Sequence, residues 1–242
     1  MIQIHELSKT FGGKRVLDRV TLGVAPGESL CIIGQSGTGK SVLLKCILGL
    51  TEPDSGRILW QGQPLNQSNR AMFMTSFGML FQGAALFDSL SVWQNVAFRL
   101  LQRLPDTKAR KIALEKMARV GLGPETADLM PAELSGGMAK RAGLARAIAD
   151  NPKVIFFDEP TTGLDPIRAH RINDLIRGIV TETGATAITI THDMDSVRAI
   201  GDRVALLQDG QIRWDGPVDQ MDDAPELSGF LHLPAKQGRI HS

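Results

Sequence analysis

The sequence lacks tyrosine altogether and contains only two cysteines among its 242 residues. Two cysteines are too few for a disulfide framework, and Cys31 and Cys46 lack the paired spacing of metal-binding cysteines. Both lie in apolar runs, SLCIIG and VLLKCILGL, where a small thiol side chain is usually buried. We therefore predict two reduced, buried thiols in a chain long enough to fold around its own hydrophobic core.

The sequence also lacks a long apolar run and a signal-peptide pattern. Its longest stretch without a charged residue, residues 71–87, is interrupted by Thr75, Ser76, Gln82 and two glycines, which argues against a membrane span. The first residues, MIQIHELSK, do not resemble a signal peptide. We expect a cytoplasmic protein, and we expect any association with a membrane to run through a partner.

An excess of either charge is absent as well. Lysine plus arginine number 27 and aspartate plus glutamate number 26. A net charge this close to zero gives no reason to expect strong nonspecific attraction to nucleic acid or to anionic lipid. We therefore expect no nucleic acid among the partners of this protein.

What the sequence does contain is an alternation of strand-like and helix-like patterns. Short apolar or alternating runs, separated by Gly, Pro and Asp turns, predict strands at residues 2–7, 16–24, 28–34 and 56–62. From residue 91 to about residue 149, apolar residues recur at helical spacing between basic ones, which predicts a mostly helical lobe. Uninterrupted apolar runs then predict strands covered on both faces at residues 153–159 and 185–193.

The end of the chain adds one helix, one hairpin and a tail. Residues 172–179 carry isoleucines and a leucine on one helical face, and residues 203–216 predict a hairpin around Asp209 and Gly210. This alternation predicts an α/β core with a parallel sheet. We expect one domain over residues 1–242, with the lobe of residues 91–149 inserted and a loosely packed tail at about 217–242.

A phosphate-binding loop is predicted where a strand passes into a helix. The segment GQSGTGKS, residues 34–41, matches G-x-x-x-x-G-K-[ST] between the runs SLCII and VLLKCILGL. Its backbone N–H groups and the following helix start would surround phosphate oxygens, Lys40 would reach the β and γ phosphates, and Ser41 would ligate magnesium. A glycine-rich surface turn is the alternative, which the flanking runs disfavour. The residues assigned to nucleotide binding are Gly34, Gln35, Ser36, Gly37, Thr38, Gly39, Lys40, Ser41 and Val42.

Two adjacent carboxylates follow the apolar run VIFF. Asp158, at the predicted strand end, stands where a carboxylate that holds magnesium belongs, and Glu159 is a candidate to orient or deprotonate a water. Two like charges beside bound phosphate are tolerable only when a cation is present. We therefore prefer this interpretation to an ordinary acidic strand end.

The motifs GQSGTGKS, LSGGM, VIFFDEP, TTGLD and THD occur in this order and span nearly the whole chain. Together they resemble the nucleotide-binding subunit of ATP-binding-cassette (ABC) transporters. The resemblance implies an α/β P-loop NTPase core with a parallel sheet, an antiparallel β region at the N-terminus and an inserted helical lobe. In that family two subunits face head to tail, so a homodimer is implied in which Ser135, Gly136 and Gly137 close over ATP held by the other copy.

The resemblance also implies roles for single residues. It implies that Phe11 stacks on adenine, where family members usually carry tyrosine, although a buried core phenylalanine is the alternative. Gln82 would sense magnesium and the membrane partner, Asp165 would contact the other copy, and His192 would contact the γ-phosphate. The residues assigned to catalysis are Glu159, His192 and Gln82. The implied cofactors are ATP and Mg²⁺, and the residues assigned to the metal are Ser41, Gln82 and Asp158.

Two segments narrow the resemblance further. Met138 stands where many relatives have glutamine, and residues 134–149 and 78–98 resemble the ATPase of bacterial Mla-type phospholipid transporters. This implies phospholipid cargo, maintenance of outer-membrane lipid asymmetry, two permease subunits, a lipid-binding accessory subunit and a place at the cytoplasmic face of the inner membrane. The apolar residues after Gln82 would either dock the permease or belong to the core of the lobe: Phe87, Leu90, Val92 and Trp93.

Three alternatives remain at this point. An importer ATPase for a small solute, such as an amino acid, shares every nucleotide motif. A soluble cassette that acts on DNA or ribosomes would be expected to carry a coiled-coil or zinc insertion, tandem cassettes or a basic stripe, and the sequence has none of these patterns. A regulatory cassette without turnover is disfavoured by the intact Glu159 and His192.

Overall fold

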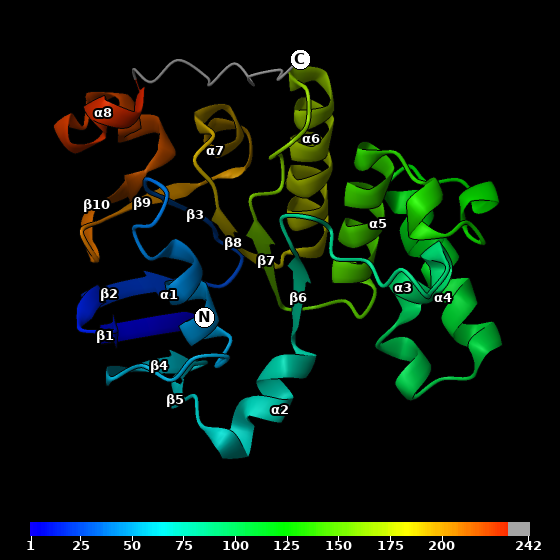
Figure 1. Cartoon of the computed structure of the whole chain (residues 1–242), viewed down its shortest axis with the longest axis horizontal. Helices are drawn as coiled ribbons and strands as arrows, with labels where there is room; N and C mark the ends of the chain where they lie inside the picture. The colour runs from blue at the N-terminus through cyan, green and yellow to red at the C-terminus, as the bar shows by residue number, and fades with distance from the viewer. Residues whose placement is uncertain (232–242) are drawn as a thin grey trace.

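The computed structural model describes residues 1–231, and their strands form two sheets (Figure 1). Sheet A is antiparallel, with the strand order β2-β1-β4-β5. Its strands are β1 (Ile2–Phe11), β2 (Lys14–Val24), β4 (Ser55–Trp60) and β5 (Gln63–Pro64). Sheet B has the order β10-β9-β3-β8-β7-β6, and only β10 runs antiparallel to its neighbour within this described part. Its strands are β3 (Ser29–Ile33), β6 (Phe77–Leu80), β7 (Val154–Asp158), β8 (Thr186–Ile190), β9 (Arg203–Gln208) and β10 (Gln211–Pro217).

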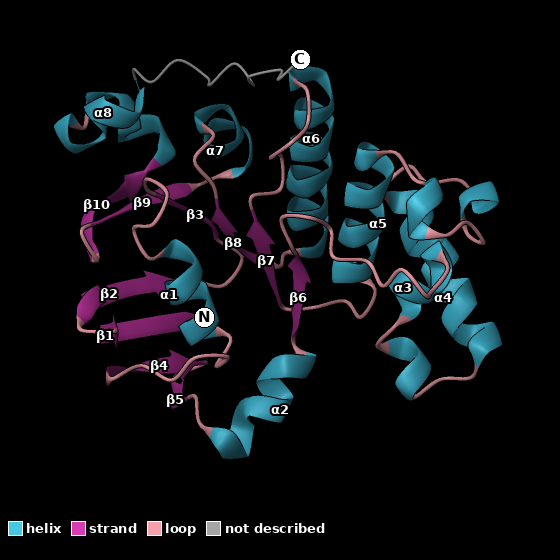
Figure 2. Cartoon of the chain, viewed as in Figure 1, coloured by secondary structure: helices cyan, strands magenta, loops and turns pink. Residues whose placement is uncertain are grey.

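Helices cover sheet B and form a separate group beyond it (Figure 2). The α-helices are α1 (Lys40–Ile47), α2 (Gln67–Thr75), α3 (Val92–Ala97), α4 (Asp106–Arg119), α5 (Gly136–Ile148), α6 (Pro166–Thr183), α7 (Met194–Ile200) and α8 (Ser228–Leu231). The 3₁₀ segments are η1 (Leu100–Gln102), η2 (Pro124–Thr126), η3 (Pro131–Glu133), η4 (Val218–Asp223) and η5 (Pro225–Leu227). Helices α3, α4 and α5 pack on one another on the side of the molecule away from sheet A.

Both faces of sheet B are buried, each against a different hydrophobic core. Along β3, Leu30 and Ile32 pack with α1 and sheet A, whereas Cys31 and Ile33 pack with helices α5, α6 and α7 on the other face. Strands β7, β8 and β9 alternate between the same two cores. This explains why the strands read as unbroken apolar runs, because all positions between their ends are buried. The predicted fold class is confirmed.

The structure also contains two elements that the sequence patterns did not predict. Helix α2 begins at Gln67 with an Asn66 side chain that accepts N–H bonds from Ser68 and Asn69. Strand β6, with the sequence FGML, then pairs in parallel with β7 at the edge of sheet B. Both lie in or next to the uncharged stretch that we took only as an argument against a membrane span. Within the described residues, no helix is long and apolar enough to cross a bilayer.

The expectation of a loosely packed tail from Pro217 onward is wrong as far as residue 227. Met221 and Leu227 are fully buried, and both belong to the core that contains α6 and α7. Two short 3₁₀ turns place these side chains on the core, which a count of acidic, Pro and Gly residues does not reveal. Residues 232–242 lie outside the described part of the chain.

Both thiols are buried, as predicted. Cys31 is 0% exposed and Cys46 is 2% exposed, and both are free. Burial raises the pKa of the Cys31 thiol to about 12 and also raises the pKa of the Cys46 thiol. Neither thiol is therefore a thiolate nucleophile at neutral pH.

Candidate active site

Three groups of predicted site residues follow the carboxyl ends of three neighbouring strands, whereas Phe11 ends β1, Gln82 follows β6 and residues 135–137 lie at the start of α5. Residues 34–39 follow β3, residues 159–165 follow β7 and residues 191–193 follow β8. Because β3, β8 and β7 are adjacent and parallel, the three loops leave sheet B at the same edge. This edge is where open α/β sheets bind ligands.

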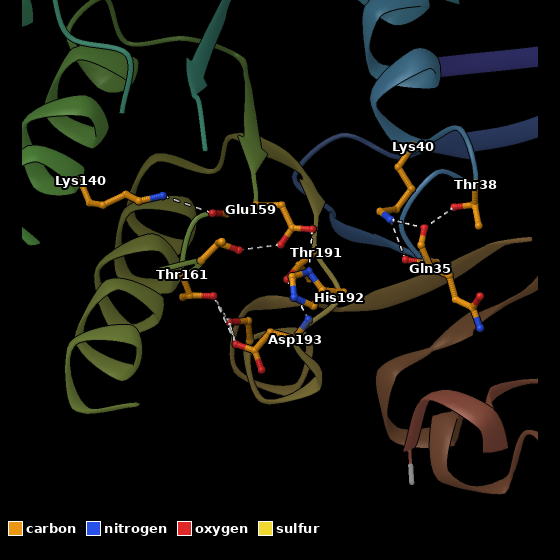
Figure 3. A network of polar contacts seen from close by, with 12 residues as sticks. Gln35, Thr38, Lys40, Lys140, Glu159, Thr161, Thr191, His192 and Asp193 are labelled. Atoms are coloured by element: carbon orange, nitrogen blue, oxygen red, sulfur yellow. Dashed lines mark hydrogen bonds and ion pairs between the residues drawn. The ribbon is translucent and has the colours of Figure 1, made fainter. Parts of the chain in front are cut away.

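The loop after β3 is closed by its own lysine (Figure 3). Lys40 Nζ donates hydrogen bonds to the carbonyl oxygens of Gly34 at 2.6 Å and Gln35 at 2.9 Å. Thr38 Oγ1 donates to the same Gln35 oxygen at 2.9 Å. Burial lowers the pKa of the Lys40 ammonium, while Glu159 and Asp158 raise it. The loop thus already holds a buried cation where an anionic ligand would arrive.

The remaining loop residues are divided between a rim and a helix start. Gln35, Ser36 and Gly37 are exposed on the rim. Ser41 is exposed and Val42 is half-buried in the first turn of α1, directly after the lysine. The helix start therefore presents a free hydroxyl and backbone N–H groups next to the loop, which suits phosphate and a magnesium ion.

Gly34 occupies a position that admits no side chain. A Cβ atom there would lie 2.3 Å from the carbonyl oxygen of Leu207 and 2.8 Å from Thr38 Oγ1. We expect Gly34→Ala to lower the free energy of unfolding by about 3 kcal/mol, because backbone on β9 must move to make room. Urea unfolding of the purified chain measures this value.

Gly178 provides the matched control for this substitution. It lies inside α6, and a Cβ atom there would meet nothing within 4 Å. Gly178→Ala is expected to raise the free energy of unfolding by about 1 kcal/mol, since alanine favours a helix interior over glycine. Equal and small effects of the two substitutions would contradict the close approach at Gly34.

The acidic pair lies at the end of β7, opposite the lysine loop. Burial raises the pKa of the Asp158 carboxyl, the adjacent Glu159 raises it further, and Lys140 and Lys40 lower it. Asp158 is half-buried and stands beside a second carboxylate, and carboxylate oxygens are ligands that Mg²⁺ takes. The described residues contain no cluster of three His, Cys, Asp or Glu side chains that would hold a metal alone. The site therefore fits magnesium that takes one protein carboxylate and the phosphates of its nucleotide.

Glu159 is held in place by contacts on several sides (Figure 3). Its backbone has a left-handed φ of 48°, a conformation that costs a residue with a side chain about 1 kcal/mol. Its N–H donates to the Ile190 carbonyl oxygen at 2.9 Å, and Thr162 Oγ1 donates to its Oε2 at 3.0 Å. His192 Nδ1 lies 2.8 Å from Oε1. The predicted catalytic glutamate and histidine are thus in direct contact.

Lys140 is a site residue that the sequence analysis missed. It lies on α5 and is only 6% exposed, and its ammonium donates to the carbonyl oxygens of Gln82 and Glu159. Burial lowers the pKa of this ammonium, while Asp158 and Glu159 raise it. The sequence signal that could have identified Lys140 is a lysine on the apolar, buried face of a helix. This contact links α5 to the exposed Gln82 and to the acidic pair.

The glycine-rich segment at 135–137 starts α5, as the resemblance implies. Ser135 Oγ accepts a 3.3 Å hydrogen bond from the Met138 N–H, and Ser135 and Gly136 are exposed. Helix α1 packs in the core on one side of sheet B and α5 packs in the core on the other side (Figure 1). The two helix starts therefore lie in different layers of the chain, and the role of Ser135, Gly136 and Gly137 in binding the nucleotide of another copy remains a prediction.

Asp165 caps helix α6 at the surface. Its Oδ1 accepts the Arg168 N–H at 3.0 Å, and its Oδ2 lies 3.2 Å from Arg168 Nε. The backbone hydrogen bond from Arg168 holds the pKa of the Asp165 carboxyl below its usual value. A capped, charged and exposed loop end is compatible with contact to a second copy, and that role remains a prediction.

The structure decides between the alternatives left open for Phe11 and for the apolar residues after Gln82. Phe11 is 48% exposed, with Lys9 Nζ 5.3 Å from its ring centroid, so the alternative of a core residue is wrong. Val92 and Trp93 are buried, so these two belong to the core of the lobe and not to a docking surface. They follow the capped start of α3, which turns them inward. Phe87 is exposed and packs on Phe98, with ring centroids 4.5 Å apart.

Comparisons with known proteins agree with this geometry. A family model described as ABC transporter matches residues 17–162. The chain is 40% identical over 232 residues to the intermembrane phospholipid transport system ATP-binding protein MlaF of Haemophilus influenzae, covering 94% of this chain and 88% of that relative. It is 41% identical over 245 residues to the methionine import ATP-binding protein MetN of Caulobacter vibrioides, covering 99% of this chain and 71% of that relative.

Other relatives are longer than this chain, and one solved structure has nearly the same extent. The probable ribonucleotide transport ATP-binding protein mkl of Mycobacterium tuberculosis is 38% identical over 238 residues. This match covers 96% of the chain but only 66% of mkl, so the chain spans about two thirds of that relative's length. A dimeric ATP-binding cassette in a post-hydrolysis state with ADP and Pi matches with a TM-score of 0.82 and 30% identity, covering 90% of this chain and 99% of that one.

Proposed function

Because the chain belongs to the ABC transporter family of ATPases, we propose that it hydrolyses ATP to drive a membrane transporter. The observation that carries the proposal is the 2.8 Å contact between Glu159 and His192 at the sheet edge that also holds the lysine-closed loop. A proton acceptor and an imidazole beside a phosphate site are the groups that phosphoryl transfer to water requires.

In this proposal, different residues of the site bind the phosphates, the base, the metal ion and the attacking water. The loop of residues 34–42 holds the phosphates, with Lys40 as the cation that faces them, and Phe11 stacks on the base. Ser41, Asp158 and Gln82 would hold Mg²⁺, which would supply positive charge to neutralise the phosphates. Glu159 orients the attacking water and accepts its proton on the carboxylate, while His192 contacts the γ-phosphate. Catalysis is then mostly positioning and charge stabilisation.

We further propose that two copies sandwich two ATP molecules head to tail. The exposed start of α5 supports this, because its backbone N–H groups are accessible to an anionic ligand from another molecule. The dimeric state of the similar cassette also supports it. In this proposal residues 1–242 form one nucleotide-binding domain with the helical lobe of residues 91–149 inserted and residues 217–242 as a C-terminal segment. Asp165 contacts the other copy.

For the cargo we propose phospholipid, in an Mla-type system that maintains outer-membrane lipid asymmetry. The support is the segment around Met138 and the 40% identity to a phospholipid transport protein. The protein would then sit at the cytoplasmic face of the inner membrane, on two permease subunits and with a lipid-binding accessory subunit. A methionine importer is equally similar in overall identity, at 41%, so a small-solute importer is the second candidate.

The experiment that separates the two candidates is gentle isolation of the tagged protein from the membrane of its native cell. Mass spectrometry of the complex is expected to find a permease, a lipid-shuttling subunit and bound phospholipid. If the complex contains a permease for a small solute and no lipid, the result would support the small-solute importer instead. DNA or ribosomal partners without a permease would overturn the transport assignment itself.

A further inference from the structure

A second polar network lies behind the Glu159–His192 contact, and none of the roles above uses it (Figure 3). We call it the buried bridge, and it consists of Thr161, Asn173, Asp193 and Ser196. Asp193 Oδ2 accepts from Ser196 Oγ at 2.6 Å and from Thr161 Oγ1 at 3.2 Å. The two hydroxyl oxygens are 3.0 Å apart, and Asn173 Nδ2 donates to Ser196 Oγ at 3.0 Å.

Three of the four residues of the bridge are buried, and Asp193 is half-buried. Thr161 is 6% exposed, Asn173 is 3% exposed and Ser196 is 0% exposed. Asn173 stands on the buried face of α6 between Ile172 and Ile176, where an apolar side chain would pack without any desolvation cost. Asn173 pairs through Nδ2 only, since its Oδ1 has no hydrogen-bond partner within the described residues. Pairing of buried polar groups fixes one arrangement of the elements that carry them.

The elements fixed in this way carry the proposed catalytic groups. Thr161 is two residues after Glu159 in the loop that leaves β7, and Asp193 directly follows His192 in the loop that leaves β8. Asp193 also caps α7, because its Oδ1 accepts the Asp195 N–H at 3.1 Å. The bridge therefore fastens the start of α7 and the His192 loop to the Glu159 loop and to α6.

His192 needs this support because its own side chain has little packing. The imidazole is 64% exposed, whereas the Glu159 side chain that it contacts is 14% exposed. Its place is therefore set by the backbone of residues 191–193. There, the Asp193 N–H donates to Thr191 Oγ1 at 3.1 Å and the Asp193 carboxylate joins the bridge.

We propose that the buried bridge is a positioning element for ATP hydrolysis and that Thr161 is the residue through which it fixes His192 against Glu159. The inference rests on the proposed ATPase function. Thr161 is a positioning residue, because its hydroxyl donates to Asp193 and contacts Ser196. Loss of its hydroxyl leaves the Ser196–Asp193 bond in place, so the fold is kept while the histidine loop loosens.

The first test is Thr161→Val, which keeps the shape of the side chain and removes one hydroxyl. In the complex isolated from the membrane, kcat for ATP is expected to fall about tenfold while KM changes less than about twofold. A change in KM with kcat preserved would overturn the proposal, because it would place Thr161 in ground-state binding.

Thr189 provides the matched control. It is 0% exposed on β8, and its hydroxyl has no hydrogen-bond partner within the described residues. Thr189→Val therefore also removes a buried threonine hydroxyl, but one that makes no hydrogen bond within the described residues. We expect this variant to keep the kcat of the wild type. If both valine variants lose the same activity, the effect comes from the core and the proposal fails.

A double-mutant cycle tests whether Thr161 acts through the histidine. In a His192→Ala background, Thr161→Val is expected to lower kcat by less than about twofold, because its target is already gone. A full tenfold loss in that background would overturn the proposal. Non-additivity of this kind is not expected from a general loss of stability.

A readout that does not need turnover keeps this inference separate from the proposed function. The His192 ring resonance of the full chain, assigned by its loss in His192→Ala, is expected to shift in Thr161→Val and to stay in place in Thr189→Val. An unmoved resonance in Thr161→Val would overturn the inference. Absence of ATP hydrolysis in the wild-type complex would overturn the proposed function, and the resonance would still decide the inference.

Discussion

Replacing Glu159 with glutamine is expected to leave ATP binding intact and to slow ATP hydrolysis by roughly 10²–10⁴-fold, the usual weight of a positioned acid or base. Glutamine has the same shape, and its amide oxygen still accepts the hydrogen bond that Thr162 Oγ1 donates at 3.0 Å. The amide has no basic oxygen, so it cannot take a proton from water. Its contact with His192 also loses the negative charge. The loop that closes on Lys40 is unchanged, so nucleotide affinity is retained.

Phosphate release and nucleotide binding, measured on the same isolated complex, check this prediction. The control is Glu182→Gln on α6, which neutralises an exposed carboxylate paired with Arg119 and lies outside the three loops of the site. This variant is expected to turn over within about twofold of the wild type, since exposed ion pairs contribute little. Near-normal turnover of Glu159→Gln would remove the glutamate from the catalytic role.

The phosphate loop and the sheet could be predicted because their signals are local. The loop needs eight consecutive residues, and its glycines report close contacts that are visible at Gly34. The strands β3, β7 and β8 are buried on both faces, so an unbroken apolar run is itself the signal. Strand β6 has only four residues, one of them glycine, and therefore carries too little pattern to be identified.

The polar contacts of the site could not be predicted because their partners are far apart along the chain. Lys140 meets the Gln82 carbonyl oxygen across 58 residues, and Thr161 meets Asp193 across 32. Only the packing of α5 against sheet B and the adjacency of β7 and β8 bring these groups together. The apolar residues after Gln82 show the same limit, since Trp93 in the core and Phe87 on the surface look alike in sequence.

Lys40→Ala is expected to weaken ATP binding by about 100-fold. A hydrogen bond to a charged group contributes about 1.5–3 kcal/mol, and about 2.8 kcal/mol corresponds to a factor of 100 in affinity. The Lys40 ammonium now donates to the carbonyl oxygens of Gly34 and Gln35, and a phosphate would offer it acceptors of full negative charge instead. Calorimetry of ATP binding measures the loss, and unchanged affinity would contradict the assignment.

Lys111→Ala is the control, because Lys111 is exposed on α4 outside the loops of the site, and this variant is expected to leave ATP affinity within about twofold of the wild type. The pH dependence of stability in the nucleotide-free protein tests the buried charge separately. Burial lowers the pKa of the Lys40 ammonium from its ordinary value of 10.5, so the folded state binds this proton more weakly than the unfolded state does. The wild type is therefore expected to lose stability relative to Lys40→Ala as the pH falls from 10.5 through the lowered pKa, whatever Lys40→Ala loses with the two hydrogen bonds that close the loop. Thermal midpoints of both nucleotide-free proteins across this pH range measure the difference, and parallel pH profiles would contradict a charge that is costly to bury.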